Sequence, residues 1–419
     1  MPNCLKTVGI MRMNNKDRKI LRSLASRQME ISLSEKNRRI VEAWKKLNRC
    51  ENDIPLVHIE LPNIANEIIP PFLRCQSDQA RRLEQDFYLN FLNQELFEDD
   101  KPVPDFFPII PGVYFHPFGF DVSKTKTNAK SGIGYHIDTV INDLHDEFHK
   151  LGSSVFGVNK EQAKTYQELA QDTFGDILPV KLSGDCLKMV PTQMVVRIMG
   201  MENMYLAILD YPDDFKRMMR LLTDDYLSFF RMLEQENHLL PTAGFENVYQ
   251  SSFAFTDELP TDVAVSTTET WGYLNSQESV GISPEMYAEF IFPYYSEIAQ
   301  QFGLLSYGCC EAPDPVWEQI RTLKNLRRLS IPVWSNEEYM GEQLRDSKII
   351  YQRKPSAETI GLYKTFDEEF VRKHINKTLH AAQGCALEIT QREVFTVHGD
   401  AGKVKRYVKL IRECIEKEW

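Results

Sequence analysis

The second half of the sequence repeats a strand–loop–helix pattern, and this pattern limits the chain to few folds. Short apolar runs typical of strands occur at 271–275, 304–307, 327–331, 348–352 and 386–390. The runs at 304–307, 327–331 and 348–352 each lead into a polar loop and a helical pattern. A repeat of this kind implies parallel strands joined by helical crossovers.

Three further runs in the first half, 56–61, 106–110 and 177–182, raise the number of predicted strands to eight. Eight such units predict an α/β fold of the (β/α)8 TIM barrel type, with its active site on the loops that follow the strands. Charged, helix-like sequence fills residues 14–49. We therefore predict an N-terminal helical extension over 1–50 and a single barrel domain over 51–419.

Composition removes several classes of partner. The 419 residues carry a formal net charge of -11, which argues against binding to nucleic acid or to an anionic membrane. Apolar runs fall short of the roughly 20 residues of a membrane span, and the N-terminus lacks the apolar core of a signal peptide. We expect a cytoplasmic protein. Its eight irregularly spaced cysteines predict thiol or metal chemistry rather than a disulfide framework.

Two adjacent cysteines and a glutamate, Cys309, Cys310 and Glu311, directly follow the run at 304–307. Soft thiolates and a carboxylate at the end of a strand indicate a metal site. Adjacent residues of a strand point to opposite faces, so only one cysteine would face the barrel axis unless the backbone turns. We favour Cys309 as a ligand and Glu311 as a ligand or base, with Cys310 as the alternate. The competing interpretation is two small buried hydrophobic residues.

Cys385 opens the last predicted strand, beside Gly384. Loops of different barrel strands can meet, so Cys385 is a second candidate ligand. Three protein ligands and one open position are typical of catalytic zinc. A cysteine packed beside a turn glycine explains Cys385 equally well.

Other polar residues end apolar runs, where a barrel keeps its chemistry. They are Asp185, predicted to be catalytic, and Gln277, predicted to bind substrate. Arg353 and Lys354 end the run at 348–352, and this basic pair could bind a substrate carboxylate. Strand-end caps and surface ion pairs are the alternative interpretations.

Aromatic residues near the same ends, chiefly Trp271 and Tyr273, would line a pocket for a flat or apolar ligand, or would fill the barrel core. His116 follows the run at 106–110 and is a further candidate for the pocket.

These segments together resemble the uroporphyrinogen decarboxylase superfamily, and especially a bacterial branch with a YGCCE stretch. The residues that carry the resemblance are Ile282 to Phe290, Pro293 to Tyr295, Tyr307 to Glu311, Leu323 to Trp334, Arg353 to Pro355, Gly384 to Ile389 and Phe174 to Val180. The resemblance implies a (β/α)8 barrel. The superfamily contains a haem-pathway decarboxylase and zinc- and corrinoid-dependent methyltransferases, whose zinc ligands are a His-x-Cys and a later cysteine.

In this resemblance Cys309 and Cys385 match the two zinc cysteines, and Tyr307 replaces the histidine. We therefore assign Glu311 as the third ligand and Tyr307 to the pocket. The decarboxylase signature QAGR does not occur in the sequence.

The resemblance thus implies a zinc-dependent methyltransferase of the O-demethylation or thiol-methylation type. Its partners would be a small-molecule methyl donor or acceptor and a corrinoid, which a separate corrinoid protein could present. One alternative is a metal-free lyase that uses Arg353 and Asp185 on a carboxylated substrate. Another is a barrel that binds a ligand without catalysis.

Overall fold

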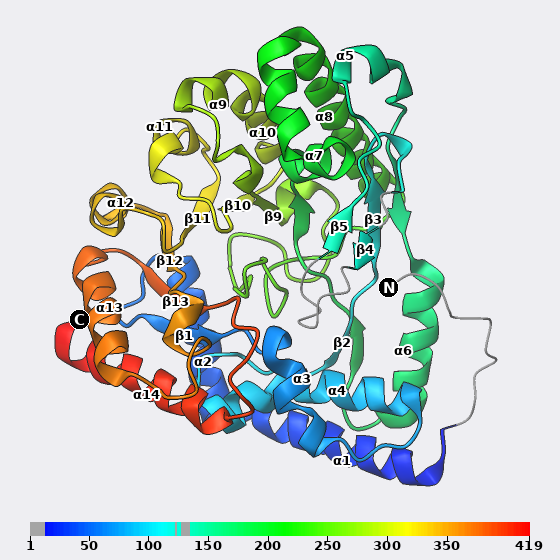
Figure 1. Ribbon diagram of the computed structural model, residues 1–419. Coiled ribbons are helices and arrows are strands. Elements are labelled where there is room, and N and C mark those ends of the chain that lie inside the picture. The colour runs from blue at the N-terminus through cyan, green and yellow to red at the C-terminus, as the bar shows by residue number, and fades with distance from the viewer. Residues whose placement is uncertain (1–12, 122–123, 127–134) are drawn as a thin grey trace.

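The computed structural model describes residues 13–121, 124–126 and 135–419. A seven-stranded parallel sheet lies at its centre, with strand order β1-β13-β12-β11-β10-β9-β8 (Figure 1). The sheet strands are β1 (Leu56–Ile59), β8 (Leu187–Met189), β9 (Trp271–Leu274), β10 (Leu304–Tyr307), β11 (Leu326–Ile331), β12 (Ile350–Arg353) and β13 (Leu387–Gln391). Because all neighbours are parallel, the carboxyl ends of these strands meet at one edge.

All eight predicted strands exist, but the closed barrel does not form. β2 (Phe107–Ile109) pairs in parallel only with β7 (Val180–Leu182), and this pair stays separate from the large sheet. The molecule is a mixed α/β protein with an open parallel sheet. Its remaining strands form two antiparallel pairs, β3 (Val113–His116) with β6 (Val155–Val158) and β4 (Lys124–Lys126) with β5 (Tyr135–Ile137).

Side chains saturate the outer edge of β1, which explains why the sheet stays open there. The backbone N–H groups of Val57 and Ile59 donate to the Asp100 and Asp99 carboxylates at 2.7 and 2.9 Å. The Asn93 amide donates to the Ile59 carbonyl at 2.9 Å. These groups take the hydrogen bonds that a neighbouring strand would otherwise form.

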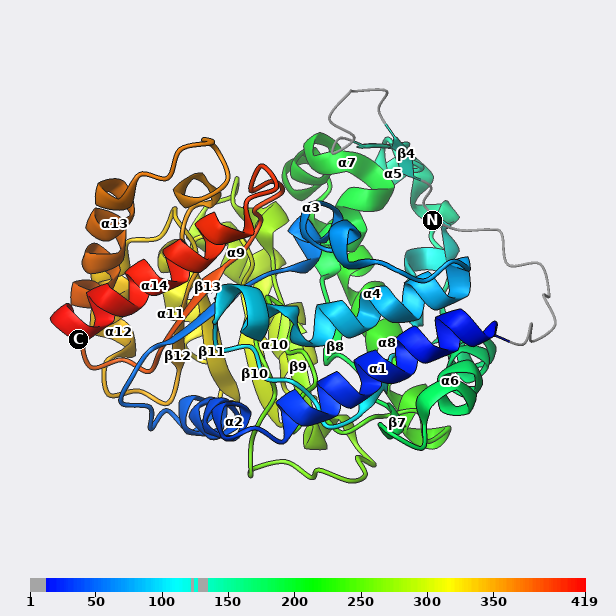
Figure 2. The ribbon, with the colours of Figure 1, turned by 90° about the horizontal axis from the view of Figure 1, so that it is seen from below.

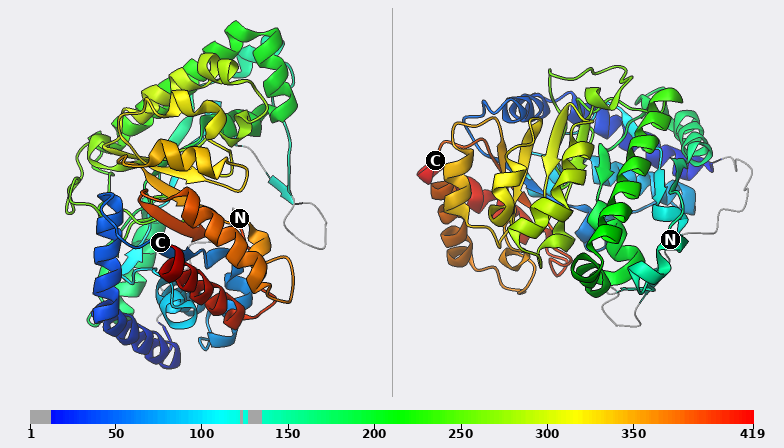
Figure 3. Two further views of the ribbon diagram at one scale, coloured as in Figure 1. Left: turned by 90° about the vertical axis from the view of Figure 1, so that its left-hand side faces the viewer. Right: turned by 90° about the horizontal axis from the view of Figure 1, so that it is seen from above.

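Helices surround the sheet and the strand pairs (Figures 1 and 3). Their bounds are α1 (Asn15–Ser32), α2 (Glu35–Asn48), α3 (Ala65–Ile68), α4 (Asp78–Leu92), α5 (Leu144–Glu147), α6 (Lys160–Phe174), α7 (Pro191–Asp210), α8 (Pro212–Gln235), α9 (Pro284–Phe290), α10 (Phe292–Ala299), α11 (Trp317–Ile320), α12 (Glu337–Leu344), α13 (Glu368–Ala381) and α14 (Ala401–Glu418). None of the helices in the described ranges is long and apolar enough to span a membrane.

The first two helices are packed against the rest of the molecule. Asn14 and Ser34 cap α1 and α2 through side-chain hydrogen bonds to the first turns. α1 lies alongside α4 (Figure 2). Trp44 of α2 is fully buried, and its indole donates to the Asp100 carbonyl at 2.7 Å. α2 thus covers the amino ends of the strands, where it packs with Leu56 and Ile350.

A long segment without regular structure, the central loop (residues 239–262), runs along the inner side of the sheet (Figure 1). Near the amino ends of the strands, Asn48 donates to the carbonyls of Phe253 and Phe255 at 2.9 and 2.7 Å. Near the middle, Ser252 donates to the buried carboxylate of Glu388 at 2.5 Å. At the carboxyl ends, the loop presents Gln250. The central loop therefore links both ends of the sheet.

Candidate metal centre

A sharp turn after β10 brings the two adjacent cysteines to one side. Gly308 has a φ of +99°, and a Cβ there would lie 2.9 Å from the Ser330 Cβ. The Cys309 N–H donates to a Glu311 carboxylate oxygen at 2.8 Å, and the Ser330 hydroxyl donates to the Cys309 carbonyl at 2.8 Å. The Sγ atoms of Cys309 and Cys310 are therefore only 3.6 Å apart. Strand alternation does not apply because the strand ends at Tyr307.

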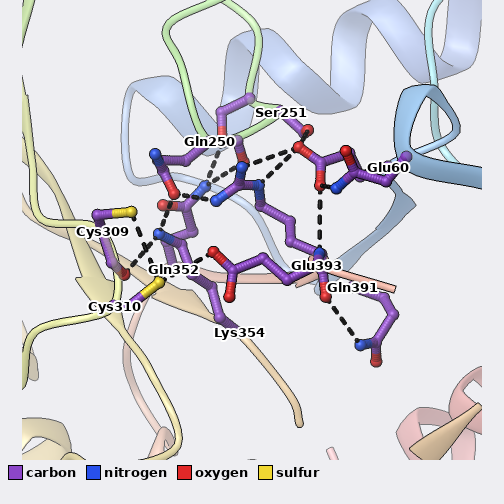
Figure 4. Close-up of polar contacts among 12 residues, drawn as sticks. Glu60, Gln250, Ser251, Cys309, Cys310, Gln352, Lys354, Gln391 and Glu393 are labelled. Atoms are coloured by element: carbon purple, nitrogen blue, oxygen red, sulfur yellow. Dashed lines mark hydrogen bonds and ion pairs between the residues drawn. The ribbon is translucent and has the colours of Figure 1, made fainter. Parts of the chain in front are cut away.

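Glu393, from the segment after β13, completes a possible ligand set with the two cysteines. The Sγ atoms of Cys309 and Cys310 and a Glu393 carboxylate oxygen all lie within 4.8 Å of one another. Cys310 Sγ is 2.9 Å from Glu393 Oε1, and Figure 4 shows both groups turned toward each other. A thiol has one proton, so Cys310 cannot donate to both Cys309 and Glu393 at once. When Cys309 is a thiolate, it shares the single Cys310 proton with Glu393, and a bound cation would offset the negative charge of these groups.

Two cations border this cluster. Lys354, directly after β12, donates to the Cys309 carbonyl at 2.9 Å and to the Gln250 amide oxygen at 2.5 Å. Arg392 donates to the same amide oxygen and forms an ion pair with Glu60 at 2.8 Å. The Cys310 thiol, followed by the charges of Lys354 and Arg392, lowers the pKa of Cys309 to about 5 despite its burial. Cys309 is therefore a thiolate at neutral pH.

Burial and the Arg392 charge in turn lower the pKa of Lys354 to about 8. The hydrogen bond and negative charge of Cys309, together with burial, raise the pKa of Cys310. The two thiols thus differ: Cys309 is the nucleophilic one, and Cys310 keeps its proton unless a cation displaces it.

Gln250 is held by an unusual backbone. Tyr249, Gln250 and Ser251 have successive φ values of 53°, 55° and 65°, in the left-handed region that residues with a Cβ rarely adopt. The Gln250 amide N–H donates to the Tyr273 hydroxyl at 2.8 Å, and that hydroxyl donates to the Gly308 carbonyl at 3.2 Å. The strained turn thus joins the cations to the backbone that carries Cys309.

Glu311 acts as a brace for the turn and lies outside the ligand cluster. Its two carboxylate oxygens accept from the N–H groups of Ser276 and Cys309 at 3.0 and 2.8 Å. Burial and the nearby Cys309 charge raise the pKa of Glu311 to about 7. Tyr307 is buried beside it and bonds the hydroxyls of Ser276 and Tyr287 at 2.7 and 2.8 Å. Both residues position the site rather than line its cluster.

A cavity of about 670 Å³ opens beside the cluster. Cys310, Glu311 and the predicted Gln277 line it, together with Arg197 and the solvent-exposed Trp334. A volume of this size accommodates a small organic molecule. The structure thus brings Cys309, Cys310, Glu311 and Gln277 together at the carboxyl ends of the strands.

Cys385 lies elsewhere. It precedes β13, so it sits at the amino end of the sheet, whereas Cys309 follows the carboxyl end of β10. Its thiol donates to the Gly341 carbonyl at 3.4 Å, and burial raises its pKa to about 11. The structure therefore does not bring the expected zinc pair of Cys309 and Cys385 together, because parallel strands place the start and the end of a strand at opposite edges.

Arg353 also faces away from the site. Its guanidinium pairs with Glu337 at 3.0 Å and donates to the Pro332 carbonyl at 2.8 Å, buried between β12 and the helices. Arg353 makes these contacts inside the protein, so it is not placed to hold a substrate carboxylate. The alternative of a metal-free lyase therefore lacks the arginine that was predicted to bind the substrate carboxylate.

The other predicted pocket residues are dispersed. Trp271 is fully buried and donates to the Ala254 carbonyl at 3.1 Å, so it belongs to the core. His116 lies in β3, which pairs with β6, and is 3.8 Å from the Asp121 carboxylate. Asp185 lines two neighbouring cavities, whose walls desolvate its carboxyl and raise its pKa to about 6.

Sequence reasoning missed Glu393, Arg392 and Gln250, and it considered Lys354 only as part of a basic pair with Arg353. Strand alternation carries a signal for Lys354: Gln352 faces the central loop, so Lys354 faces the same way and Arg353 does not. Arg392 and Glu393 follow the last strand directly, a position that a parallel sheet brings to its functional edge. Gln250 carries no local signal, because the central loop has no periodic pattern.

Comparison with known proteins identifies the fold. No family profile and no curated protein sequence matches the chain. Among solved structures, a methyltransferase from Methanosarcina mazei is similar, with 9% sequence identity and a TM-score of 0.51. The similarity covers 89% of this chain and 98% of that chain. At this identity the likeness shows a shared fold.

Proposed function

We propose that the chain is a zinc-dependent methyltransferase that passes a methyl group to or from a corrinoid, which a separate protein presents. The convergence of the ligand atoms of Cys309, Cys310 and Glu393 within 4.8 Å of one another carries the proposal. Thiolate and carboxylate donors suit zinc, and three protein ligands leave a fourth position open to substrate. In this proposal Cys310 and Glu393 replace the predicted ligands Cys385 and Glu311.

Zinc bound there would supply a Lewis acid that activates a substrate thiol or polarises a methyl donor's oxygen. The chain's own residues fix the position of the ligand sulfur. Glu311 and Ser330 hold both sides of the Cys309 peptide. Lys354 and Arg392 offset negative charge at the thiolates, and Gln250 keeps both cations in place. An arrangement fixed in advance costs no reorganisation during reaction.

The cavity beside Cys310 supports a small-molecule methyl donor or acceptor, with Gln277 in its wall. Trp334 and Val280 at its lining are 77% and 65% exposed, so an apolar rim faces solvent. A flat macrocycle presented by a partner protein could stack on such a rim. The shared fold with the Methanosarcina mazei methyltransferase agrees with the proposed reaction class.

The test starts from protein purified without chelator and without oxygen. We expect about one zinc per chain and methyl transfer between methylcobalamin and a thiol, followed by the absorbance change of the cobalamin. Cys309→Ser should abolish both, whereas Cys385→Ser, at the other end of the sheet, should preserve both. Zinc absent from the wild-type protein, or zinc retained by Cys309→Ser and lost by Cys385→Ser, would refute the proposal.

A further inference from the structure

A second cavity adjoins the metal centre. Its volume is about 410 Å³, and its walls include Lys188, Arg197 and Tyr249. Arg197 belongs to the walls of both this cavity and the one that contains Cys310. The two cavities therefore meet at the Arg197 guanidinium, close to the proposed metal ligands.

Lys188 of β8 points into the second cavity. It pairs in register with Tyr273, so the two side chains project from the same face of the sheet. Its amino group lies 5.3 Å from the centre of the Tyr249 ring, which in turn stacks on Tyr273 at 5.1 Å. The Lys188 charge is near enough to interact with Cys309 and with Arg197.

Among the described residues, neither cation is in direct contact with a carboxylate, although the charges of Cys309 and Glu278 act on Lys188. Within the described ranges, no carboxylate forms an ion pair with Lys188 or Arg197. Arg197 donates to the Gln193 amide oxygen at 3.0 Å and to the Met194 sulfur at 3.8 Å, and these contacts use two of its five N–H groups. By contrast, the interior arginines Arg328 and Arg353 are each paired with a glutamate at 3.0 Å. The Asp185 carboxylate also lines this cavity, so two cations face it against one carboxylate. In a chain of net charge -11, this local excess of positive charge favours an anionic ligand.

We propose that Lys188 and Arg197 form a subsite for an oxyanion, a carboxylate or a phosphate, at one end of the small-molecule substrate. The other end of that molecule then extends past Arg197 toward Cys310. The assignment of the far end as the methyl donor or acceptor rests on the proposed function. The oxyanion subsite itself rests only on the two cations and the cavity that they share.

Binding of two isosteric probes tests the subsite. Titration calorimetry on the intact protein would compare 3-(methylthio)propanoate with its neutral amide, 3-(methylthio)propanamide. We expect the acid to bind at least about tenfold more tightly, as charge-assisted hydrogen bonds predict. Lys188→Met and Arg197→Met should each remove most of that preference and leave amide affinity unchanged. Arg231→Met, which alters an exposed arginine of α8, should keep the preference.

Competition identifies the oxyanion. Stronger displacement of the acid by inorganic phosphate than by acetate assigns a phosphate, and the reverse order assigns a carboxylate. Equal affinity of the wild-type protein for acid and amide would overturn the subsite, as would an equal loss in Arg231→Met. A preserved acid preference in protein without zinc or methyl transfer would instead overturn the proposed function and leave the subsite standing.

Discussion

Two cysteines at opposite ends of the parallel sheet have pKa values shifted in opposite directions. At the carboxyl end, Cys309 sits beside a second thiol and two cations, and its pKa falls to about 5. At the amino end, Cys385 is buried against the Gly341 carbonyl, and its pKa rises to about 11. The same residue type is thus a thiolate in one place and an inert core thiol in the other. Surroundings, rather than residue type, determine which cysteine can bind a metal or act as a nucleophile.

Thiol alkylation gives the largest expected difference between the two ends. In chelator-treated protein at pH 7, a pKa of about 5 leaves Cys309 ionised, whereas a pKa of about 11 leaves Cys385 roughly 10⁴-fold less ionised. Iodoacetamide labelling followed by mass spectrometry should show at least that ratio. The Cys309 rate should stay level from pH 9 to pH 6 and fall below about pH 5, since protonation removes the thiolate.

Loss of the Cys310 thiol sharpens this prediction. Cys310→Ala removes the leading cause of the low Cys309 pKa, so the midpoint of the Cys309 rate profile should move to higher pH. An unchanged midpoint would show that another group stabilises the thiolate.

Adjacent residues Arg353 and Lys354 offer the next comparison, this time in stability. Arg353→Met leaves the buried Glu337 carboxylate without its arginine, which should lower the free energy of unfolding by about 3–5 kcal/mol. Lys354→Met removes hydrogen bonds at the site only, so the loss should be about 1 kcal/mol. Urea unfolding measures both. A larger loss from Lys354→Met than from Arg353→Met would reverse the roles assigned to them.

Zinc affinity separates Glu393 from ordinary surface acids. Glu393→Gln keeps the shape of the side chain but removes its charge, and zinc affinity should fall at least about 10- to 100-fold, the range seen for groups that only support ligands. Glu338→Gln, an exposed carboxylate paired with Lys377, is the matched control and should bind zinc normally. Competition with a coloured chelator gives both constants. Equal affinities would remove Glu393 from the ligand set.

Gln250 gives the smallest expected effect. Gln250→Ala removes the acceptor shared by Lys354 and Arg392 and frees the strained turn. The rate of methyl transfer should fall roughly threefold to tenfold, the value of one or two hydrogen bonds. Ser251→Ala, in the same turn, removes only a hydrogen bond to Glu60 and should change the rate less. An unchanged rate of methyl transfer in Gln250→Ala would show that the central loop does not contribute to the site.

Sequence periodicity predicted the strands well because each buried strand needs an apolar run between polar turns. All eight expected runs are strands. The closed barrel was wrong because Asp99 and Asp100 saturate the edge of β1 with side-chain oxygens, an interaction between residues some forty positions apart. Local pattern does not contain that information.

The site was predicted in part. The run that ends at Tyr307 predicted that Cys309, Cys310 and Glu311 follow the carboxyl end of a strand, and the structure has them there, with Gln277 in the wall of the same cavity. The pairing of Cys309 with Cys385 came from the place of Cys385 at the last strand and from the resemblance. Both arguments overlooked that Cys385 precedes its strand, whereas Cys309 follows its own, so the two cysteines lie at opposite edges of a parallel sheet. Glu393 follows β13, whereas Cys385 precedes it, so Glu393 is the residue of this strand's flanks that lies at the same edge of the sheet as Cys309. Gln250 arrives through the central loop, which only the tertiary structure reveals.

The number of sulfur atoms bound to zinc tests the central claim most directly. X-ray absorption at the zinc edge of the wild-type protein should show two sulfur ligands, supplied by Cys309 and Cys310, with oxygen or nitrogen in the remaining positions. Cys309→Ser should lose its zinc, and Cys385→Ser should still show two sulfur ligands. A wild-type spectrum without zinc, or one whose sulfur count falls in Cys385→Ser, would contradict a metal centre built from Cys309, Cys310 and Glu393.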